Sequence, residues 1–315
     1  MRVITSAEID RVLTFPALID ALAEAFRGDV VTPVRHHHEI ERSGAHGTLL
    51  LMPAWTGSAA ANGFLGVKIV TVFPDNGAKN LPSVLGTYLL MDGATGAPLA
   101  GLDGTRLTVW RTAAASALAG RALARKDAHR MVMVGAGALA PFLIRAHASQ
   151  RDLSEIALWN HRPERAESVA AALRTEGLPV TAVTDLEGAV RQADIVSCAT
   201  LSNDPIVKGA WLKPGAHLDL VGAFNLAMRE SDDVAVQRAE VYVDTDAALS
   251  EGGDVALSLK SGAIARSHVK GTLFDLCRNP VTRNDDAITL FKSVGTALED
   301  LAAAMLVWRS LPLGA

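Results

Sequence analysis

The chain has 315 residues, of which 49% are hydrophobic and 20% are charged, and its formal net charge is −4. This length allows two domains with separate cores, and the balanced charge gives no electrostatic reason to bind nucleic acid or anionic membranes. Two cysteines, one of them in an apolar run, do not favour disulfides or a thiolate metal site. Neither an export signal nor a membrane span is evident. We expect a cytoplasmic protein that binds neither nucleic acid nor membranes.

The first part of the chain predicts two helices and then a sheet. Thr5 and Glu8 have the spacing of a capping box, and a second helix begins after Thr14 and ends at Gly28. Short apolar or alternating runs follow, separated by glycine, proline and asparagine, without a helix between them. This pattern predicts a mostly antiparallel sheet. The runs cover residues 48–55, 64–73 and 86–92, and an alanine-rich helix is expected over 107–126.

The second part of the chain alternates strand and helix. Because each pair of parallel strands needs a crossover, this alternation predicts a parallel sheet with helices on both faces. A last helix over 296–309 has the composition to pack back on the first part. We expect an α/β protein with one domain at 1–115, completed by the C-terminal helix at 296–315, and another at 116–295. The strands are expected at 130–134, 155–160, 180–183, 194–199, 217–221 and 240–243.

One glycine-rich turn follows a strand and precedes a helix. Gly135 permits the tight turn, Gly137 lets a pyrophosphate approach the backbone, and Ala140 allows close helix packing. Ala138 and Leu139 lead into the helix, whose unpaired N–H groups can bind phosphate. Glycine turns also occur for structural reasons alone, but this strand–turn–helix setting predicts a Rossmann domain that binds a nicotinamide dinucleotide.

The residues after the next strand bear on the choice of nucleotide. An acid there would accept bonds from the ribose hydroxyls and repel a 2′-phosphate. The chain instead has Asn160, His161, Arg162 and Arg165, and arginine pairs bidentately with phosphate. This predicts a preference for NADPH, with NADH as a possible cofactor. The alternative is that the two arginines are solvated residues at a helix start.

Three basic residues of the first part are candidates to bind an anionic substrate. Lys68 lies in an apolar strand, and Arg111 begins an otherwise alanine-rich stretch, where the positive end of a helix would need an anion nearby. Arg35 precedes three histidines and is a third candidate. Either of the first two charges could instead extend to solvent. Only His36 and His38 could share a metal ion on one strand face, and no metal is expected.

Short motifs are spread over nearly the whole chain, namely GVKIV at 66–70, PDN at 74–76, LPSV at 81–84, DGATGAPLA at 92–100, DG at 103–104, LT at 107–108, RTAA at 111–114, GAG at 135–137, WN at 159–160 and FKSVG at 291–295. In these motifs the chain resembles the ornithine cyclodeaminase and mu-crystallin family. The resemblance implies a homodimer in which the sheets of two first domains join. It also implies that Lys68 and Arg111 are catalytic and hold a substrate carboxylate, with Arg35 as a third contact. Arg111 and the residues Ser83, Thr112, Ala199, Thr200, Val221 and Ser293 are expected near the cofactor.

One position bears on the reaction. In cyclodeaminases of the family an aspartate follows the Val-Gly pair after the fifth Rossmann strand, and Phe224 stands there in this chain. The neighbouring Ala-Phe and Met-Arg-Glu elements are similar to the ketimine reductase branch, although Asn225 and Leu226 replace its usual Thr-Pro. The resemblance therefore implies NAD(P)H-dependent reduction of a small cyclic 2-imino acid, Δ1-pyrroline-2-carboxylate or Δ1-piperideine-2-carboxylate, to L-proline or L-pipecolate. The alternatives are an NAD-dependent ornithine cyclodeaminase and a mu-crystallin-like protein that binds a small ligand.

Overall fold

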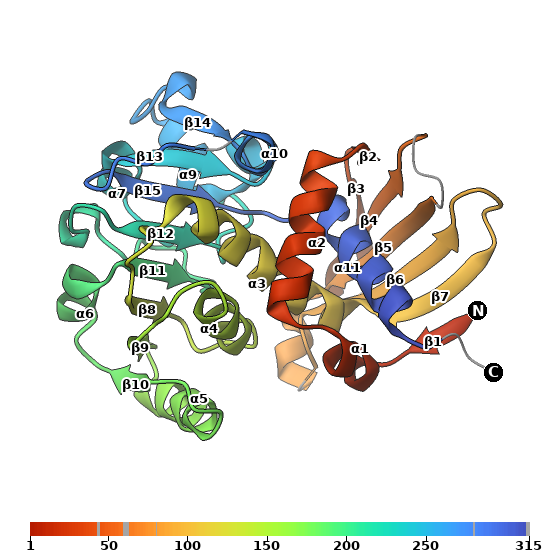
Figure 1. Ribbon diagram of the computed structural model, residues 1–315, viewed down its shortest axis with the longest axis horizontal. Coiled ribbons are helices and arrows are strands. Elements are labelled where there is room, and N and C mark those ends of the chain that lie inside the picture. The colour runs from red at the N-terminus through yellow and green to blue at the C-terminus, as the bar shows by residue number, and fades with distance from the viewer. Residues whose placement is uncertain (43–44, 59–62, 80, 280, 313–315) are drawn as a thin grey trace. The chain divides into compact units, whose positions relative to one another are not determined.

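The computed structural model describes residues 1–42, 45–58, 63–79, 81–279 and 281–312. The chain forms two compact units, Met1–Thr112 together with Thr296–Ala315, and Ala113–Gly295. Helix α3 (Gly104–Leu123) runs from one unit into the other, and the boundary expected after residue 115 lies within it. Figure 1 shows the order of the elements along the chain.

Unit 1 is built on a seven-stranded sheet that is mostly antiparallel, as predicted. Its order is β1-β7-β6-β5-β4-β2, with β3 also paired to β4, and only β1 and β7 run parallel among the described pairs. The sequence prediction omitted β1, β2, β3 and β7, because β3 reads HHHEIER without apolar alternation and the others are short or contain proline and glycine. The strands are β1 (Arg2–Ile4), β2 (Val30–Val31), β3 (His36–Arg42), β4 (Ala45–Thr56), β5 (Phe64–Val72), β6 (Val84–Asp92) and β7 (Pro98–Asp103).

Among its described residues, unit 1 wholly contains the helices α1 (Ser6–Val12), α2 (Phe15–Arg27) and α11 (Ala297–Ser310). The predicted capping box at Thr5 and Glu8 is present, and Gly28 closes α2. Helix α11 packs on α2 and on the strands β4, β5 and β6, so it covers one face of the sheet (Figure 1). A 3-10 turn, η1 (Pro74–Lys79), connects β5 to β6.

Unit 2 contains an eight-stranded parallel sheet of order β10-β9-β8-β11-β12-β15-β13-β14. This order confirms the predicted Rossmann topology, with its switch point between β8 and β11, where ligands bind at the carboxyl ends of the strands. Strands β14 and β15 were missed by the sequence prediction. The strands are β8 (Arg130–Val134), β9 (Glu155–Trp159), β10 (Val180–Val183), β11 (Ile195–Cys198), β12 (His217–Leu220), β13 (Ala239–Val243), β14 (Val269–Thr272) and β15 (Ile288–Lys292).

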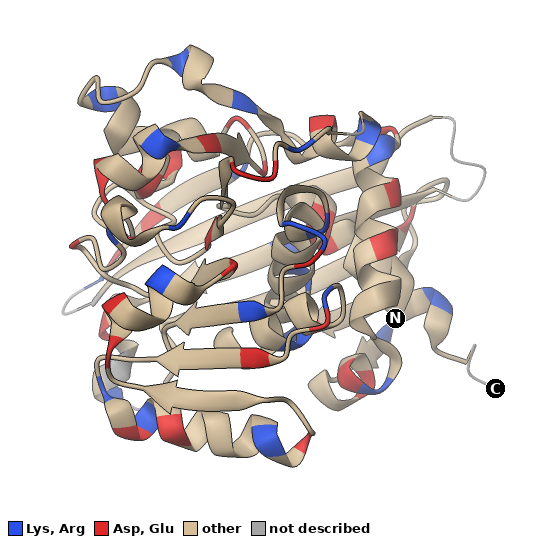
Figure 2. Cartoon of the chain, turned by 60° about the vertical axis from the view of Figure 1, so that its left-hand side comes forward, with Lys and Arg blue, Asp and Glu red and all other residues tan. Residues whose placement is uncertain are grey.

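Apolar strand residues such as Val132, Val196 and Leu218 form the core of unit 2. Figure 2 shows basic and acidic residues interspersed over the outer helices. Of the helices within the described residues, none is both long and apolar enough to cross a membrane. The remaining elements are α4 (Ala140–Ala148), α5 (Pro163–Thr175), α6 (Leu186–Gln192), α7 (Asp233–Arg238), α8 (Ala248–Glu251), α9 (Gly253–Lys260), α10 (Leu273–Arg278), η2 (Gly209–Trp211) and η3 (Arg266–His268).

Candidate active site

The glycine turn after β8 has the backbone that the sequence predicts. Gly135 adopts a φ of 106°, and a Cβ there would lie 2.6 Å from the Ala199 carbonyl oxygen. A Cβ on Gly137 would have no neighbour within 4 Å apart from the adjoining residues of the chain, so this backbone faces open space. The turn then enters α4 at Ala140, which is fully buried. A tight turn with open space at Gly137 thus leads into a helix N-terminus, which is the arrangement that accepts a pyrophosphate.

A pocket of about 510 Å³ opens at this turn, at the carboxyl edge of the unit 2 sheet. It brings together segments that are far apart in the sequence: the glycine turn, the end of β9 and the loop after β11. Seven of the residues predicted to bind the cofactor line it, namely Gly135, Gly137, Asn160, His161, Arg165, Ala199 and Thr200. Ala136, Trp159, Leu201, Ser202 and Ile206 complete the lining and were not predicted.

The end of β9 carries polar side chains into this pocket. The buried Asn160 amide accepts a hydrogen bond from the Ala136 N–H at 3.4 Å and donates one to the Arg162 carbonyl at 3.1 Å, which ties the glycine turn to the start of α5. His161 and Arg165 line the pocket and are exposed, while Arg162 is the exposed N-cap residue of α5. This edge of the pocket therefore offers a neutral amide and exposed guanidinium groups.

The basic candidates Lys68 and Arg111 are both buried in unit 1, with 2% and 6% of their surface exposed. The Lys68 ammonium lies 2.9 Å and 2.7 Å from the two carboxylate oxygens of Asp300. Arg111 donates from Nε to Asp300 at 3.0 Å and from Nη1 to Glu299 at 2.7 Å. Asp300 therefore holds both cations, and the alternative that either charge extends to solvent is wrong.

The prediction that Arg111 opposes the positive end of a helix is also wrong. Helix α3 begins at Gly104, so Arg111 is its eighth residue, two turns inside the helix. Asp103 accepts a hydrogen bond from the Arg106 N–H at 2.8 Å and supports the earlier start, in a stretch whose glycine and threonines lower its helix propensity. The anion that Arg111 needs is supplied inside unit 1, by α11.

Glu299 and Asp300 were missed by the sequence prediction. Acids in the first turn of a helix are usually explained by their favourable interaction with the helix dipole, and both lie in the first turn of α11. Their apolar neighbours, in Ala-Leu-Glu-Asp-Leu-Ala, could have indicated that both acids are buried, as the apolar neighbours of Lys68 did. Both carboxylates have no exposed surface, so each needs a buried partner.

Burial and charge together set the proton affinities in this cluster. Burial, with a smaller contribution from the neighbouring Arg111 charge, lowers the pKa of Lys68 to about 8 against the opposing attraction of Asp300. The pKa of Arg111 is raised by Asp300 and Glu299, which outweigh the effect of burial. Tyr88 lies directly opposite Lys68 on β6, and burial beside Asp300 raises the pKa of its hydroxyl well above the usual range. Lys68 is thus a cation that can lose its proton near neutral pH.

The other predicted residues are spread over both units. Arg35 is half-buried and Ser83 exposed in unit 1, where the Ser83 hydroxyl lies 3.4 Å from the Pro74 carbonyl. Thr112 is half-buried at the unit boundary. In unit 2, Val221 and Ser293 are buried at the ends of β12 and β15, and Ala138 and Leu139 lie in the glycine turn. Phe224, at 42% exposure, follows β12.

The two histidines of β3 that share a strand face, His36 and His38, are exposed, with ring centres 6.4 Å apart. Among the residues that the structure describes, no group of three or more His, Cys, Asp or Glu side chains is placed to hold a metal ion.

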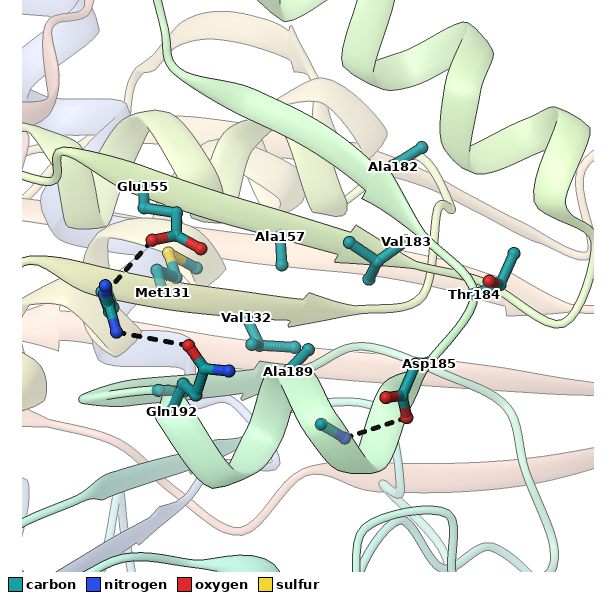
Figure 3. Close-up of a pocket in the computed structure, with 13 residues that line it drawn as sticks. Met131, Val132, Glu155, Ala157, Ala182, Val183, Thr184, Asp185, Ala189 and Gln192 are labelled. Atoms are coloured by element: carbon teal, nitrogen blue, oxygen red, sulfur yellow. Dashed lines mark hydrogen bonds and ion pairs between the residues drawn. The ribbon is translucent and has the colours of Figure 1, made fainter.

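A second pocket of unit 2, of about 490 Å³, lies over the sheet face beside α6 (Figure 3). Val132, Ala157 and Val183 are among its lining residues, and at one end Arg130 pairs with Glu155 at 3.2 Å and bonds Gln192 at 3.3 Å. It includes neither the glycine turn nor the loop after β11. Because nucleotides bind at the carboxyl ends of parallel strands, the pocket at Gly135 is the better candidate.

Comparison with known proteins agrees with these features. Residues 2–312 match the ornithine cyclodeaminase/mu-crystallin family. A Δ1-pyrroline-2-carboxylate reductase of Colwellia psychrerythraea is 35% identical, over 99% of both chains.

Two solved structures have the same fold over nearly their whole length. One is the Thermococcus litoralis Δ1-pyrroline-2-carboxylate reductase in complex with NADH and L-proline, with a TM-score of 0.91 and 32% identity over 98% of this chain and 97% of that one. The other is an archaeal alanine dehydrogenase dimer with bound NAD, with a TM-score of 0.89 and 28% identity over 98% and 95%. Together with the match over residues 2–312, these likenesses show that the chain belongs to the ornithine cyclodeaminase/mu-crystallin family.

Proposed function

We propose that the protein reduces a small cyclic 2-imino acid with NAD(P)H, converting Δ1-pyrroline-2-carboxylate or Δ1-piperideine-2-carboxylate to L-proline or L-pipecolate. The observation that carries this proposal is the charge balance of the buried cluster in unit 1. Two cations, Lys68 and Arg111, face two carboxylates, Glu299 and Asp300, so the cluster is formally neutral. A protonated cyclic imino acid has one positive and one negative charge and keeps this balance, whereas a simple anion would disturb it.

The residues have separate roles in this reaction. The Nε and Nη1 bonds of Arg111 leave its Nη2 donors for the substrate carboxylate, and the Lys68 ammonium provides a second donor. The Asp300 carboxylate keeps both donors in place. A substrate that enters as the neutral imine must first be protonated, and the pKa of Lys68, lowered to about 8, makes this side chain a candidate to supply that proton.

The pocket of unit 2 fits the nucleotide. A side chain at Gly137 would fill the open space in front of the turn, and the glycine of this chain leaves that space for a pyrophosphate. When bound, the reduced nicotinamide supplies the hydride to the imine carbon. Unit 1 would then be the substrate domain and unit 2 the nucleotide-binding domain. This agrees with the division expected from the sequence, in which one domain covers 1–115 and 296–315 and the other covers 116–295.

The preference for NADPH, the homodimer and the cytoplasmic location are supported by single residues, by relatives and by composition. Asn160 in place of an acid, together with Arg165 at the pocket, supports NADPH over NADH, although the two related structures contain NADH and NAD. The dimer of the archaeal relative supports a homodimer. The near-neutral composition fits a cytoplasmic enzyme.

The test is oxidation of NADPH by the purified protein in the presence of Δ1-pyrroline-2-carboxylate. We expect saturable turnover with this imine and with its six-membered homologue, and a large loss in Arg111→Ala. Exposed Arg266→Ala, in a surface ion pair, is the control and should retain activity. Absence of imine-dependent oxidation by the wild-type protein, with either reduced cofactor, would overturn the proposal.

The main alternative is ornithine cyclodeamination. Phe224, which stands where cyclodeaminases have an aspartate, cannot accept or deliver a proton, and this favours the reductase. Release of ammonia from ornithine without net change of cofactor would favour the cyclodeaminase. Tight binding of a small ligand without turnover of any imino acid would favour a binding protein.

A further inference from the structure

Glu230 has no exposed surface and accepts hydrogen bonds from two different loops of unit 2. Its Oε1 accepts from the N–H of Thr200 at 2.6 Å and from the Thr200 hydroxyl at 2.9 Å. Its Oε2 accepts from the N–H of Gly222 at 2.7 Å and of Ala223 at 3.3 Å. One carboxylate therefore joins the loop after β11 to the loop after β12.

The two loops approach each other closely beside the Glu230 carboxylate. A Cβ on Gly222 would lie 2.0 Å from the Thr200 carbonyl oxygen and 2.5 Å from Oε1 of Glu230, so no other residue fits at 222 without moving backbone. The first loop continues into the pocket of the glycine turn through Thr200, Leu201 and Ser202. The second begins at Val221, one of the residues expected near the cofactor. Glu230 thus fixes the separation of the two loops that border the switch point.

The backbone of Glu230 is itself held in place. Its N–H donates to Asp254 of α9 at 2.8 Å, and its carbonyl accepts from Ile206 at 3.0 Å and Val207 at 2.9 Å. Asp254 lies 3.3 Å from the ammonium of Lys292 on β15, and neither has an exposed side chain. Glu230 belongs to the loop after β12, and its backbone is anchored to α9 and to the loop after β11, so its carboxylate is held in place between the two loops.

We propose that Glu230 is a positioning residue that holds the loops after β11 and β12 in the arrangement required by the nicotinamide half of the nucleotide. The proposal rests on the proposed function, since it assumes that a dinucleotide binds at this edge. In this topology the adenosine half lies toward the end of β9, and the nicotinamide half lies beyond the switch point, toward β11 and β12. Loss of the Glu230 bonds should weaken binding of the whole dinucleotide and spare its adenosine half.

The same carboxylate makes this effect dependent on pH. Burial and the neighbouring Asp254 charge raise the pKa of Glu230 to about 7, and Lys292 and the bonds from Thr200 and Gly222 oppose the rise. Besides Asp254 and Lys292, the buried Cys198 thiol of β11 lies near Glu230, and burial together with Glu230 raises the pKa of this thiol well above the usual range, so it stays protonated. Above about pH 7 the ionised carboxylate accepts all four bonds, and below it protonation removes acceptor capacity. Binding should therefore weaken as the pH falls.

The experiment compares NADH and adenosine monophosphate as ligands of the wild type, Glu230→Gln and Glu230→Asp. The two ligands are compared at about pH 8, where the phosphate monoester of adenosine monophosphate is ionised, and NADH is used for the pH series because it lacks the 2′-phosphate of NADPH, which titrates at about pH 6. We expect both variants to bind NADH about tenfold more weakly, a difference of about 1.4 kcal/mol, with adenosine monophosphate binding changed less than about twofold. The wild-type Kd for NADH should rise between about pH 8 and about pH 6, and Glu230→Gln should lose this dependence. Asp219→Asn, another buried carboxylate of unit 2 that bonds Ser197 and His147, is the matched control and should keep the wild-type selectivity and pH profile.

The outcomes separate this inference from the proposed function. If wild-type protein binds no dinucleotide, the proposed function fails. If the wild type binds NADH and Glu230→Gln binds it equally well, or loses both ligands in parallel, the positioning role is wrong and the proposed function stands. Should Glu230→Gln not fold, Glu230→Asp, which keeps the charge but is one methylene shorter, decides between these outcomes by the same ratio of the two affinities.

Discussion

Lys68 and Asp300 form an ion pair of 2.7 Å although they are 232 positions apart in the sequence and neither side chain is more than 3% exposed. Asp300 also accepts from Arg111, so a single carboxylate satisfies two buried cations. Buried ion pairs of this kind contribute little net stability, but removal of one partner leaves an uncompensated charge. Removal of one partner should therefore cost more stability than the intact pair contributes.

Asp300→Ala should destabilise unit 1 by about 3–5 kcal/mol, because it leaves Lys68 and Arg111 buried without their shared carboxylate. Lysine can release its proton, whereas arginine stays charged, so Arg111 should account for most of the cost. Chemical denaturation of the variant and the wild type measures the difference. Asp246→Ala, which breaks the exposed pair with Arg266, should change stability by less than about 1 kcal/mol. Equal effects of the two variants would contradict this interpretation.

Activity should decline above about pH 8 if Lys68 holds the substrate carboxylate. Its folded-state pKa of about 8 means that the ammonium is present below this pH and is lost as the pH rises through it. In Lys68→Arg the guanidinium stays charged, so any remaining activity should persist to higher pH. Profiles of kcat/KM against pH test this, with the exposed Lys270→Arg as control. A decline that is unchanged in Lys68→Arg would assign it to another group.

Two glycines of the same turn should respond differently to substitution. Gly137→Val should abolish NADH binding while leaving the melting temperature of the free protein unchanged, because its side chain would enter the open space before the turn. Gly135→Ala should lower stability by about 1–3 kcal/mol, because its φ of 106° suits glycine and its Cβ would clash with the Ala199 carbonyl. Thermal unfolding and NADH titration of both variants test this. A lower melting temperature of Gly137→Val would show that the space in front of Gly137 is needed for folding and is not reserved for the nucleotide.

Arg165→Ala should weaken NADPH binding by about tenfold, the loss of a charged hydrogen bond to phosphate, and leave NADH binding nearly unchanged. Arg174→Ala on the same helix, which breaks a surface pair with Glu167, is the control and should affect neither nucleotide. Comparison of the two dissociation constants in each variant provides the measurement. Tighter NADH than NADPH binding by the wild type would refute the preference predicted from Asn160, Arg162 and Arg165.

The Rossmann half of the fold was predictable because its signals are local. A regular alternation of apolar strands and helices, with one glycine turn, was sufficient to predict a parallel sheet and six of its strands, although β15, which lies between β12 and β13, was missed. Strand β3 carries no such signal, since its polar residues are exposed and only its pairing with β4 makes it a strand. Local pattern could not supply that long-range pairing.

The candidate sites were predictable in part for a similar reason. Lys68 and Arg111 stood out as charges in apolar surroundings, but the acids that neutralise them lie about 190 to 230 positions away on α11. Glu230 was known only as part of a Met-Arg-Glu element. Its role depends on the approach of two loops, which a sequence read residue by residue does not reveal.

The division of unit 1 between the two ends of the chain has a consequence for biosynthesis. During translation, Lys68 and Arg111 leave the ribosome long before α11, which carries their carboxylates, has been made. The strands of unit 2 are all contained between residues 113 and 295. Unit 2 can therefore fold before the C-terminal part of unit 1 has been synthesised. A chain cut short before residue 296 would therefore release a nascent sheet whose buried cations have no counter-ions, a substrate for chaperones and proteases.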